Sequence, residues 1–419
     1  MSALPFFLTW SQQRDAAPVE LHGGEGVWFF GADQTRWFDM GSLSYQASLG
    51  HGHTAIVDAI CAQARRMCLS MPNAVYPEKF ALAQALLRLA PEGFSKVFFT
   101  LGGAEAVENA LKIVKMASGR SQVISRYRSY HGATMGALAL SGDYRRPPLG
   151  PRVPGFIHVL DTECAQCPGQ TRPKTCSHPP LSHIPRVMEL EGPNTIAAVF
   201  LETVTGGNGV IVPPAGYLRT VREACDRHGA FLVCDEVLTG FGRTGRTFAF
   251  EHFDDVSPDV IVLGKAITAG YAPLGAVLVH DRIARHFEDN TLFCGLTQYA
   301  HPLGIAAALK AIECFHGQGI NENVTKLEPV FEMGLASLIE KHTPWLTRFR
   351  VIGLLAALDI AADARQLARL RDALGHHRIH AHLRSDLGAL ILAPPLCITE
   401  VELGEGLRLV DAAITEAFA

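Results

Sequence analysis

The sequence predicts an α/β protein with a central, mostly parallel sheet, flanking helices, and a smaller α+β domain formed by both ends of the chain. The middle of the chain alternates short apolar runs with longer amphipathic segments, a pattern typical of βαβ units. The chain has 419 residues, of which 48% are hydrophobic and 19% are charged. That is enough for about two to four domains, and it excludes a disordered chain.

A large domain is expected at residues 71–305. Helical spacing marks Ala104–Ala117 and Tyr217–His228. An irregular stretch at 161–185, rich in Pro, Cys and His, interrupts the domain. Apolar runs predict strands at Val97–Thr100, Val123–Ile124, Phe156–Leu160, Ala197–Leu201, Ala230–Cys234, Val260–Leu263 and Gly275–Val279.

The two ends of the chain, residues 1–70 and 306–419, are expected to form the smaller domain. A long helical stretch follows residue 300. The other predicted pieces are a strand at Trp28–Phe30, a turn at Gly31–Asp33, a helix at Ala55–Arg66, and strands at Ile352–Ile360 and Ala389–Ala393.

Charge and the N-terminal residues limit the function classes. The net charge of −4 argues against a nucleic-acid partner, which requires a basic patch or stripe. No Lys or Arg precedes Arg14, and Pro5 interrupts the first apolar stretch, so the pattern of a secretory signal is missing. No run approaches the ~20 apolar residues that span a bilayer. We therefore expect a soluble, cytoplasmic protein with reduced thiols and no membrane partner.

A glycine-containing segment, Leu101–Ala106, lies between a predicted strand and a predicted helix. Backbone N–H groups at a helix N-terminus favour a negative charge such as a phosphate. The same segment could also be a tight strand–helix turn without a ligand.

Two charged residues follow predicted buried strands. Asp235 ends one strand, where a carboxylate can pair with a cationic ring nitrogen of a cofactor; a helix-capping or ion-paired acid is the alternative. Lys265 follows the next strand, where a desolvated amine can act as a nucleophile; a surface lysine in a loop is the alternative. Gly240–Gly245 fits the dinucleotide-binding pattern G-x-G-x-x-G, but no helical period follows it, so it does not predict a nicotinamide site.

A phosphate cradle, a ring-nitrogen carboxylate and a Schiff-base lysine together indicate an aldehyde cofactor. The chain resembles the class III aminotransferases, pyridoxal-phosphate (PLP) enzymes of fold type I, and within them the omega-amino acid or amine:pyruvate branch. The matching segments, in family order, are FFTLGGAEAVENALK, SYHGATMGAL, LVCDEVLTGFGRTG, GKAITAGYAPLGAVLV, GLTQYAHPLG and LAPPLCIT.

The resemblance implies a role for each matching residue. Lys265 would form the Schiff base with the cofactor and later move a proton between the substrate carbon and the cofactor. Asp235 would keep the pyridine nitrogen protonated. Thr297 would bind the phosphate of the neighbouring subunit's cofactor, which implies a homodimer with shared active sites. The remaining implied positions are Gly102, Gly103 and Ala104 at the phosphate, Tyr130, His131 and Val237 at the ring, and Glu202 and Tyr45 near the cofactor and substrate.

The sequence departs from the family pattern at positions that bear on the substrate. Leu101–Gly103 replaces an Asn-Ser-Gly phosphate loop, and Thr203 follows Glu202 where the family has Pro. Glu400 aligns with a mobile Arg that pairs with a substrate carboxylate, so an amino or ammonium group would be favoured there. Arg384 could be a substitute cation. Alternatively, Glu400 simply caps the following helix.

A cluster of possible metal ligands lies in the irregular stretch: Cys164, Cys167, Cys176 and His178, with His183 beyond. C-x-x-C spacing suits zinc or an iron–sulfur cluster, and the 4-aminobutyrate aminotransferase group offers a precedent for the cluster. The segment could equally bind nothing. Of the ten cysteines, Cys61, Cys225, Cys234 and Cys314 are expected to be buried thiols.

The sequence thus predicts a PLP-dependent transaminase that works in two half-reactions. An amine, diamine or omega-amino acid would be the donor, and a keto acid, pyruvate or 2-oxoglutarate, the acceptor. The alternatives are another PLP reaction on the same scaffold (decarboxylase, racemase or aminomutase) and an iron–sulfur-linked regulatory protein.

Overall fold

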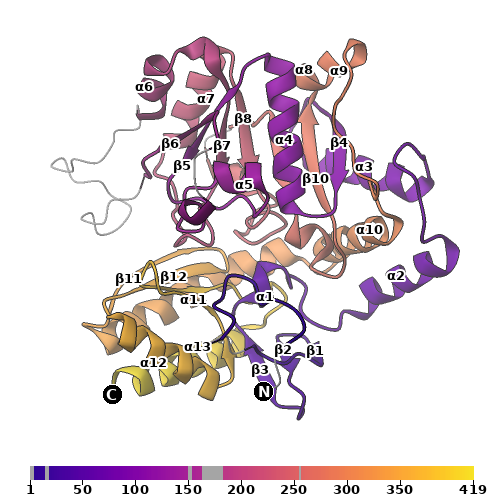
Figure 1. The fold of residues 1–419 in the computed structure, drawn as a ribbon. Helices are drawn as coiled ribbons and strands as arrows, with labels where there is room; N and C mark the ends of the chain where they lie inside the picture. Colours follow the sequence, from indigo (N-terminus) through magenta and orange to yellow (C-terminus); the bar gives the residue numbers. More distant parts are fainter. Residues whose placement is uncertain (1–3, 15–17, 150–152, 163–182, 254–255) are drawn as a thin grey trace.

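The computed structural model describes residues 4–14, 18–149, 153–162, 183–253 and 256–419. Figure 1 shows a large sheet with helices on both faces and, below it, a second group of sheets and helices that contains both ends of the chain. The predicted α/β architecture is therefore confirmed. The domain boundaries at residues 70 and 305 stay predictions.

The large sheet has seven strands in the order β4-β10-β9-β8-β7-β5-β6. Strands β5 to β9 pair in parallel, whereas β10 runs antiparallel to both of its neighbours. The sheet is thus mostly parallel, as predicted. The strands are β4 Phe94–Thr100, β5 Gln122–Arg126, β6 Phe156–Val159, β7 Ile196–Glu202, β8 Phe231–Asp235, β9 Val260–Leu263 and β10 Gly275–His280.

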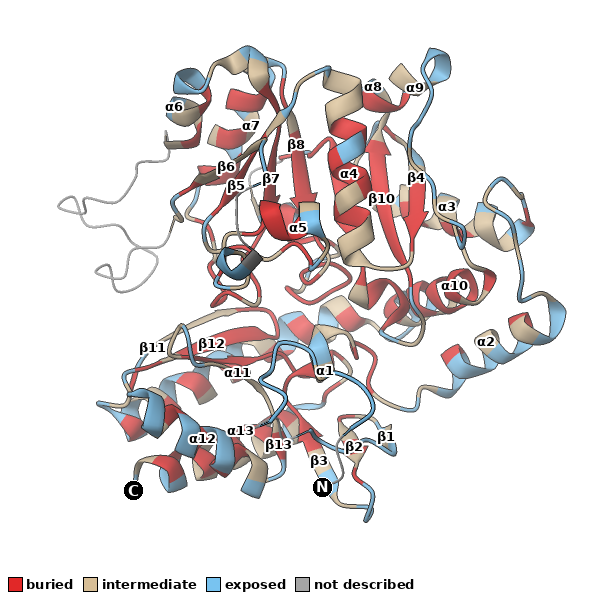
Figure 2. Cartoon of the chain, viewed as in Figure 1, coloured by how far each residue is buried: buried red, intermediate tan, exposed pale blue. Residues whose placement is uncertain are grey.

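Neighbouring residues along the strands enter two different cores. Val233 packs with α4 (Gly103–Ser118) on one face, and Leu232 packs with α7 (Tyr217–His228) on the other. This is the burial expected of a sheet covered on both faces. Figure 2 shows the sheet strands buried along most of their length. The remaining helices of this part are α3 Pro77–Leu89, α5 Met135–Leu140, α6 His183–Leu190, α8 Asp281–Ala284 and α9 His286–Asp289.

The lower group joins the two ends of the chain through backbone pairing. Strand β13 (Ile379–His380) pairs in parallel with β3 (Arg36–Asp39). β3 pairs antiparallel with β2, and β2 pairs antiparallel with β1. The other strands are β1 Gly23–Glu25, β2 Trp28–Phe30, β11 Leu346–Ile352, β12 Leu355–Ile360, β14 His382–Arg384 and β15 Ala389–Leu392. The helices are α1 Ser42–Tyr45, α2 Thr54–Arg66, α10 Pro302–Gly317, α11 Ile320–His342, α12 Ala364–His376 and α13 Glu400–Phe418.

The structure corrects two details of the sequence analysis. The segment Ile352–Ile360 is not one strand, because Gly353 and Leu354 turn the chain between β11 and β12, which pair antiparallel. Gly353 has a φ of 55°, and an added Cβ would lie 2.6 Å from the backbone of Thr244. Of the four cysteines expected to be buried thiols, Cys225 and Cys234 are buried, whereas Cys61 on α2 is exposed and Cys314 is only partly buried.

A fully buried arginine connects the large sheet's loops to the lower group. Arg243 donates from Nη1 to the carbonyls of Leu354 and Pro394, at 3.0 and 2.6 Å, and from Nη2 to Ser42 Oγ at 3.2 Å. Burial lowers the pKa of Arg243 to about 10, so it remains charged at neutral pH. Removing it would leave buried carbonyls without donors, and such unpaired polar groups are costly.

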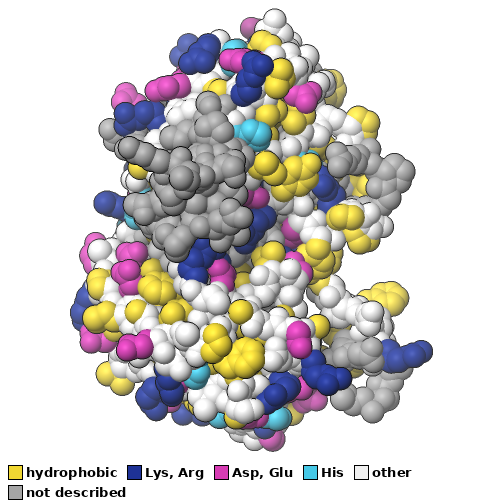
Figure 3. Space-filling model, turned by 90° about the vertical axis from the view of Figure 1, so that its left-hand side faces the viewer, with side chains coloured by type: hydrophobic (Ala, Val, Ile, Leu, Met, Phe, Trp, Pro, Cys, Tyr) yellow, Lys and Arg dark blue, Asp and Glu magenta, His cyan; other side chains and the backbone are white. Residues whose placement is uncertain are grey.

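Charges are mixed on the surface that Figure 3 shows, where Lys and Arg side chains are interspersed with Asp and Glu. Within the residues that the structure describes, no helix combines the length and apolar character needed to cross a membrane.

The hairpin turn generates a test of the backbone argument. Gly353→Ala is expected to lower the free energy of unfolding by about 1–3 kcal/mol, because alanine is strained at positive φ and its Cβ meets the Thr244 backbone. The matched control is Gly404→Ala in α13, where an added Cβ meets nothing within 4 Å; it should stabilise by about 0.5–1 kcal/mol. Urea unfolding measures both, and equal effects would contradict the assignment.

Candidate active site

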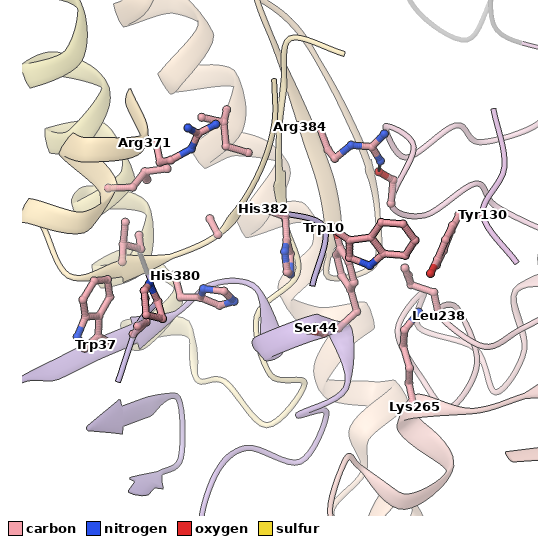
Figure 4. Close-up of a pocket in the computed structure, with 18 of the residues that line it drawn as sticks. Trp10, Trp37, Ser44, Tyr130, Leu238, Lys265, Arg371, His380, His382 and Arg384 are labelled. Carbon is pink, nitrogen blue, oxygen red and sulfur yellow. Dashed lines mark hydrogen bonds between the residues drawn. The ribbon is translucent and has the colours of Figure 1, made fainter. Parts of the chain in front are cut away.

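A cavity of about 1320 Å³ lies where the ends of β7, β8 and β9 face residues of the lower group. Ligands of open α/β sheets bind outside the carboxyl ends of the strands. Figure 4 shows part of its lining, with Lys265 at one side and Trp37 at the other. The cavity brings together ten of the residues selected from the sequence: Tyr45, Gly103, Ala104, Tyr130, His131, Glu202, Asp235, Val237, Lys265 and Arg384.

Gly264 separates Lys265 from the end of β9, and Lys265 begins a single 3₁₀ turn, Lys265–Thr268. Its φ of 41° is unusual for a non-glycine residue, and such strain is common at functional sites. Desolvation lowers the pKa of Lys265, the carboxylates of Asp235 and Glu202 oppose the shift, and Arg145 adds to it. The position therefore favours a neutral, nucleophilic amine more than the surface of the protein would.

Asp235 ends β8 and is only 4% exposed. Its Oδ2 accepts a hydrogen bond from His131 Nδ1 at 2.7 Å, and its Oδ1 accepts one from the Val237 backbone N–H at 3.1 Å. On its other side, the His131 ring contacts Ser125 Oγ at 3.2 Å. A chain of buried groups thus fixes the orientation of this carboxylate.

The N-terminus of α4 faces the same cavity through Gly103 and Ala104. Gly102 precedes it in an extended conformation, but Gly102 itself is not among the lining residues. An added Cβ at Gly264 would lie 3.1 Å from Gly103, so glycine lets the backbone beside Lys265 approach the helix N-terminus. Free N–H groups and the helix dipole suit a phosphate there.

Glu202 ends β7 and organises the loop that carries Tyr130. Its Oε1 accepts a hydrogen bond from the Tyr130 backbone N–H and its Oε2 accepts one from Gly206 N–H, both at 2.9 Å. Burial raises the pKa of Glu202. The Tyr130 ring meets Trp10 edge to face, with ring centroids 6.3 Å apart.

Tyr45 lies 5.7 Å from Lys265 Nζ, measured from its ring centroid. It stacks on His382 at 4.0 Å and 28°. Burial lowers the pKa of His382 to about 4, and its Nε2 lies 3.0 Å from the Gly41 carbonyl. His382 is therefore neutral near pH 7 and holds Tyr45 at the cavity wall. Sequence reasoning missed His382, although it is two residues from Arg384 on β14 and thus on the same face of the strand.

Two expected site residues lie elsewhere. Glu400 is outside the cavity, in the first turn of α13, where it is exposed and lies 3.7 Å from Lys326. The expectation that its charge shapes the substrate pocket is not met, since a helix N-terminus favours an acid by itself. Thr297 is exposed and also outside the cavity.

The predicted metal ligands Cys164, Cys167, Cys176 and His178 lie outside the described residues. Within the described part of the chain, no group of three or more His, Cys, Asp or Glu side chains is arranged to hold a metal ion. Gly240–Gly245 forms turns, and the next element is a short 3₁₀ helix, Ala249–His252, rather than the α-helix that a dinucleotide fingerprint opens.

Sequence reasoning also missed Arg145 and Trp10, which line the cavity near Tyr130. No motif marks either residue. Both lie in irregular segments that fold over the sheet edge, so only the three-dimensional structure brings them to the site.

The geometry defines a class of protein. An amine and a fixed carboxylate at adjoining strand ends, facing a helix N-terminus, are the contacts that a phosphorylated pyridine aldehyde requires. The residues present therefore fit PLP.

The chain belongs to the class-III aminotransferase family, whose match covers residues 9–414. A probable aminotransferase of Mycobacterium tuberculosis is 37% identical, over 76% of this chain and 70% of that protein. The taurine–pyruvate aminotransferase of Bilophila wadsworthia is 29% identical, over 97% and 94%. The crystal structure of taurine:2-oxoglutarate aminotransferase from Bifidobacterium kashiwanohense, in complex with PLP and glutamate, has a TM-score of 0.89 at 34% identity, covering 98% and 95%.

The lowered pKa of Lys265 predicts how the cofactor-free protein takes up PLP. Only the unprotonated amine attacks an aldehyde, so the uptake rate should rise with pH to a midpoint below 10.5, the ordinary lysine value. Glu202→Gln removes a charge that raises this pKa, so its midpoint should be lower still. Stopped-flow absorbance measures the rates. A midpoint at or above 10.5, or an upward shift in the variant, would contradict this account.

Proposed function

We propose that Lys265 is the amine that carries PLP and that Asp235 binds the ring nitrogen of the cofactor in this aminotransferase. The observation that carries the proposal is their placement. Asp235 pairs in register with Val262, three residues before Lys265, so the two side chains enter one cavity from adjacent strands. The surroundings differ as the roles require: an amine whose pKa is lowered, and a carboxylate held by His131.

The other contacts follow from the cavity lining. Gly103 and Ala104 bind the phosphate through backbone N–H groups at the start of α4. Val237 and Tyr130 pack on the two faces of the ring. Gly102 orients the first turn of α4, and a Cβ added at this position would meet nothing within 4 Å.

When bound, PLP supplies an electron sink that weakens the bonds at the donor's amine-bearing carbon. The Asp235 carboxylate would accept a hydrogen bond from the protonated ring nitrogen, and His131 keeps this carboxylate from turning away. Lys265 Nζ would take a proton from the donor's amine-bearing carbon and later give it up again. Its lowered pKa suits this work, because a neutral amine is a base and a protonated amine is not.

The donor is an amine, diamine or omega-amino acid, and the acceptor is pyruvate or 2-oxoglutarate. Support comes from the relatives, whose names pair an amino donor with pyruvate or 2-oxoglutarate. Tyr45 and Glu202 bound the donor's side of the cavity, and Arg384 contributes a positive charge to its wall.

A homodimer in the cytoplasm is the proposed assembly. Large apolar side chains are exposed along one stretch of chain, among them Leu69 and Val75, both 84% exposed, and Phe80 at 61%. Phe293 at 71% and Thr297 are exposed on a second stretch. A partner subunit would cover these side chains and bring Thr297 to the neighbouring cofactor. The mass of the protein in solution tests this.

An iron–sulfur cluster or zinc ion at Cys164, Cys167, Cys176 and His178 stays a hypothesis that rests on the C-x-x-C spacing alone. Iron, zinc and sulfide analysis of protein purified without oxygen tests it.

The assignment of Lys265 predicts where the cofactor becomes fixed. After borohydride reduction of the PLP-loaded protein, peptide mass mapping should find the cofactor on Lys265. The yellow colour of the cofactor bound to lysine should disappear at the same time. Lys265→Ala should lose both signals and lower kcat by about 10³-fold or more. Lys326→Ala, a change at an exposed lysine of α11, is the control. Cofactor found on another residue, or full activity in Lys265→Ala, would refute the proposal.

A further inference from the structure

The cavity contains two arginines close to the Lys265 end, and they differ in how far their donors are used. Arg384 is fully engaged: Nε and Nη2 donate to the two carboxylate oxygens of Asp386, at 2.9 and 2.8 Å. Nη2 also donates to Asn208 Oδ1 at 2.9 Å, and Nη1 donates to the Gly207 carbonyl. This guanidinium is held by the protein and is largely neutralised by Asp386.

Arg145 is engaged far less. Among the described residues, its ion-pair partner is Asp143, whose Oδ2 lies 3.2 Å from Nη2. That contact is not aligned as a hydrogen bond, because Asp143 Oδ2 is buried and has no donor among the described residues. Arg145 Nε is likewise buried and has no hydrogen-bond partner among the described residues. The side chain as a whole is 13% exposed. A buried guanidinium with unused donors is costly unless a ligand satisfies it.

Aromatic rings fix the position of Arg145 at the cavity wall. Its guanidinium carbon lies 4.0 Å from the ring centroid of Tyr130 and 5.2 Å from those of Trp10 and Tyr144. Arg145 also hydrogen-bonds the Tyr130 hydroxyl, so one of its donors is used there. The cation–π contacts orient the guanidinium, and its Nε has no partner among the described residues. Its charge also acts on the reacting centre: it adds to the desolvation that lowers the pKa of Lys265, and it opposes the rise that burial causes in the pKa of Tyr45.

The other charged side chains of the cavity are either far from Lys265 or already hydrogen-bonded by the protein. Figure 4 places Arg371 on the side away from Lys265, near Trp37 and His380, and Arg371 donates to Ser385 Oγ. Glu400, which the sequence analysis expected to repel a carboxylate, lies outside the cavity. Of the carboxylates that do line the Lys265 end, Glu202 accepts two backbone hydrogen bonds and Asp235 accepts from His131 and Val237.

We infer that Arg145, with Trp10 and Tyr144 beside it, binds the acid group of the amino donor, so that the enzyme prefers omega-amino acids with a terminal carboxylate or sulfonate over diamines and neutral amines. The inference rests on the proposed function. Guanidinium groups bind both acid types through paired N–H donors. Arg145 thereby replaces Arg384 as the residue that selects the substrate.

Three donors of matched length test the inference: β-alanine, 2-aminoethanesulfonate and propylamine, which carry a carboxylate, a sulfonate and a methyl group at the same position. In Arg145→Gln, kcat/KM for the two acidic donors should fall about 10- to 100-fold, as expected for loss of hydrogen bonds to a charged group. Most of the change should be in KM. Propylamine should lose far less than the acidic donors, because the only effect that it shares with them is the loss of the Arg145 charge near Lys265. Arg145→Lys should recover part of the loss for the acidic donors. Arg365→Gln, at an exposed position of α12, is the matched control.

A binding measurement covers the case in which none of these donors reacts. Propane-1-sulfonate and butyrate carry the acid group without an amine, and both should protect the cofactor-loaded wild type from borohydride at lower concentrations than they protect Arg145→Gln. Equal losses for all three donors, or undiminished use and binding of the acids by Arg145→Gln, would overturn the inference. Failure of Lys265 to carry the cofactor would instead refute the proposed function.

Discussion

The arrangement on which the structure's function depends is an amine and a carboxylate at the ends of adjacent parallel strands. Asp235 and Lys265 are thirty residues apart in sequence, but β8 and β9 pair directly and deliver both to one cavity. The amine has to lose its charge, whereas the carboxylate has to keep its charge. Desolvation makes it easier for the amine of Lys265 to lose its proton, while His131 and a backbone N–H stabilise the charge of the carboxylate.

The lower group of elements completes the site rather than merely covering it. Strand β14 supplies His382 and Arg384, and His382 holds Tyr45 against the cavity near Lys265. Arg243 fixes this group to the loop after β8 through three hydrogen bonds. Because both parts form the pocket, its shape depends on how they pack. Irregular segments, such as those that carry Trp10 and Arg145, can add specificity to a rigid scaffold of strands and helices.

The sequence was most informative where the local pattern and the tertiary structure agree. Buried strands of the large sheet are continuous apolar runs, so β7 to β9, and with them Asp235 and Lys265, could be located by residue. It was least informative for contacts between distant loops. Nothing in the local sequence indicates that Trp10 and Tyr130 meet beside Arg145, nor that Arg384 reaches Gly207 and Asn208. The Ile352–Ile360 prediction failed because a tight turn at Gly353 interrupts an otherwise continuous apolar run.

The protonation state of the cofactor's ring nitrogen tests the central claim most directly. The protein loaded with PLP that carries ¹⁵N in the ring gives this state by nuclear magnetic resonance at neutral pH. The account predicts a protonated nitrogen in the wild type, because the Asp235 carboxylate would accept a hydrogen bond from it, and loss of that proton in Asp235→Asn. An unprotonated nitrogen in the wild type, or a protonated one in both proteins, would contradict the pairing of Asp235 with the ring.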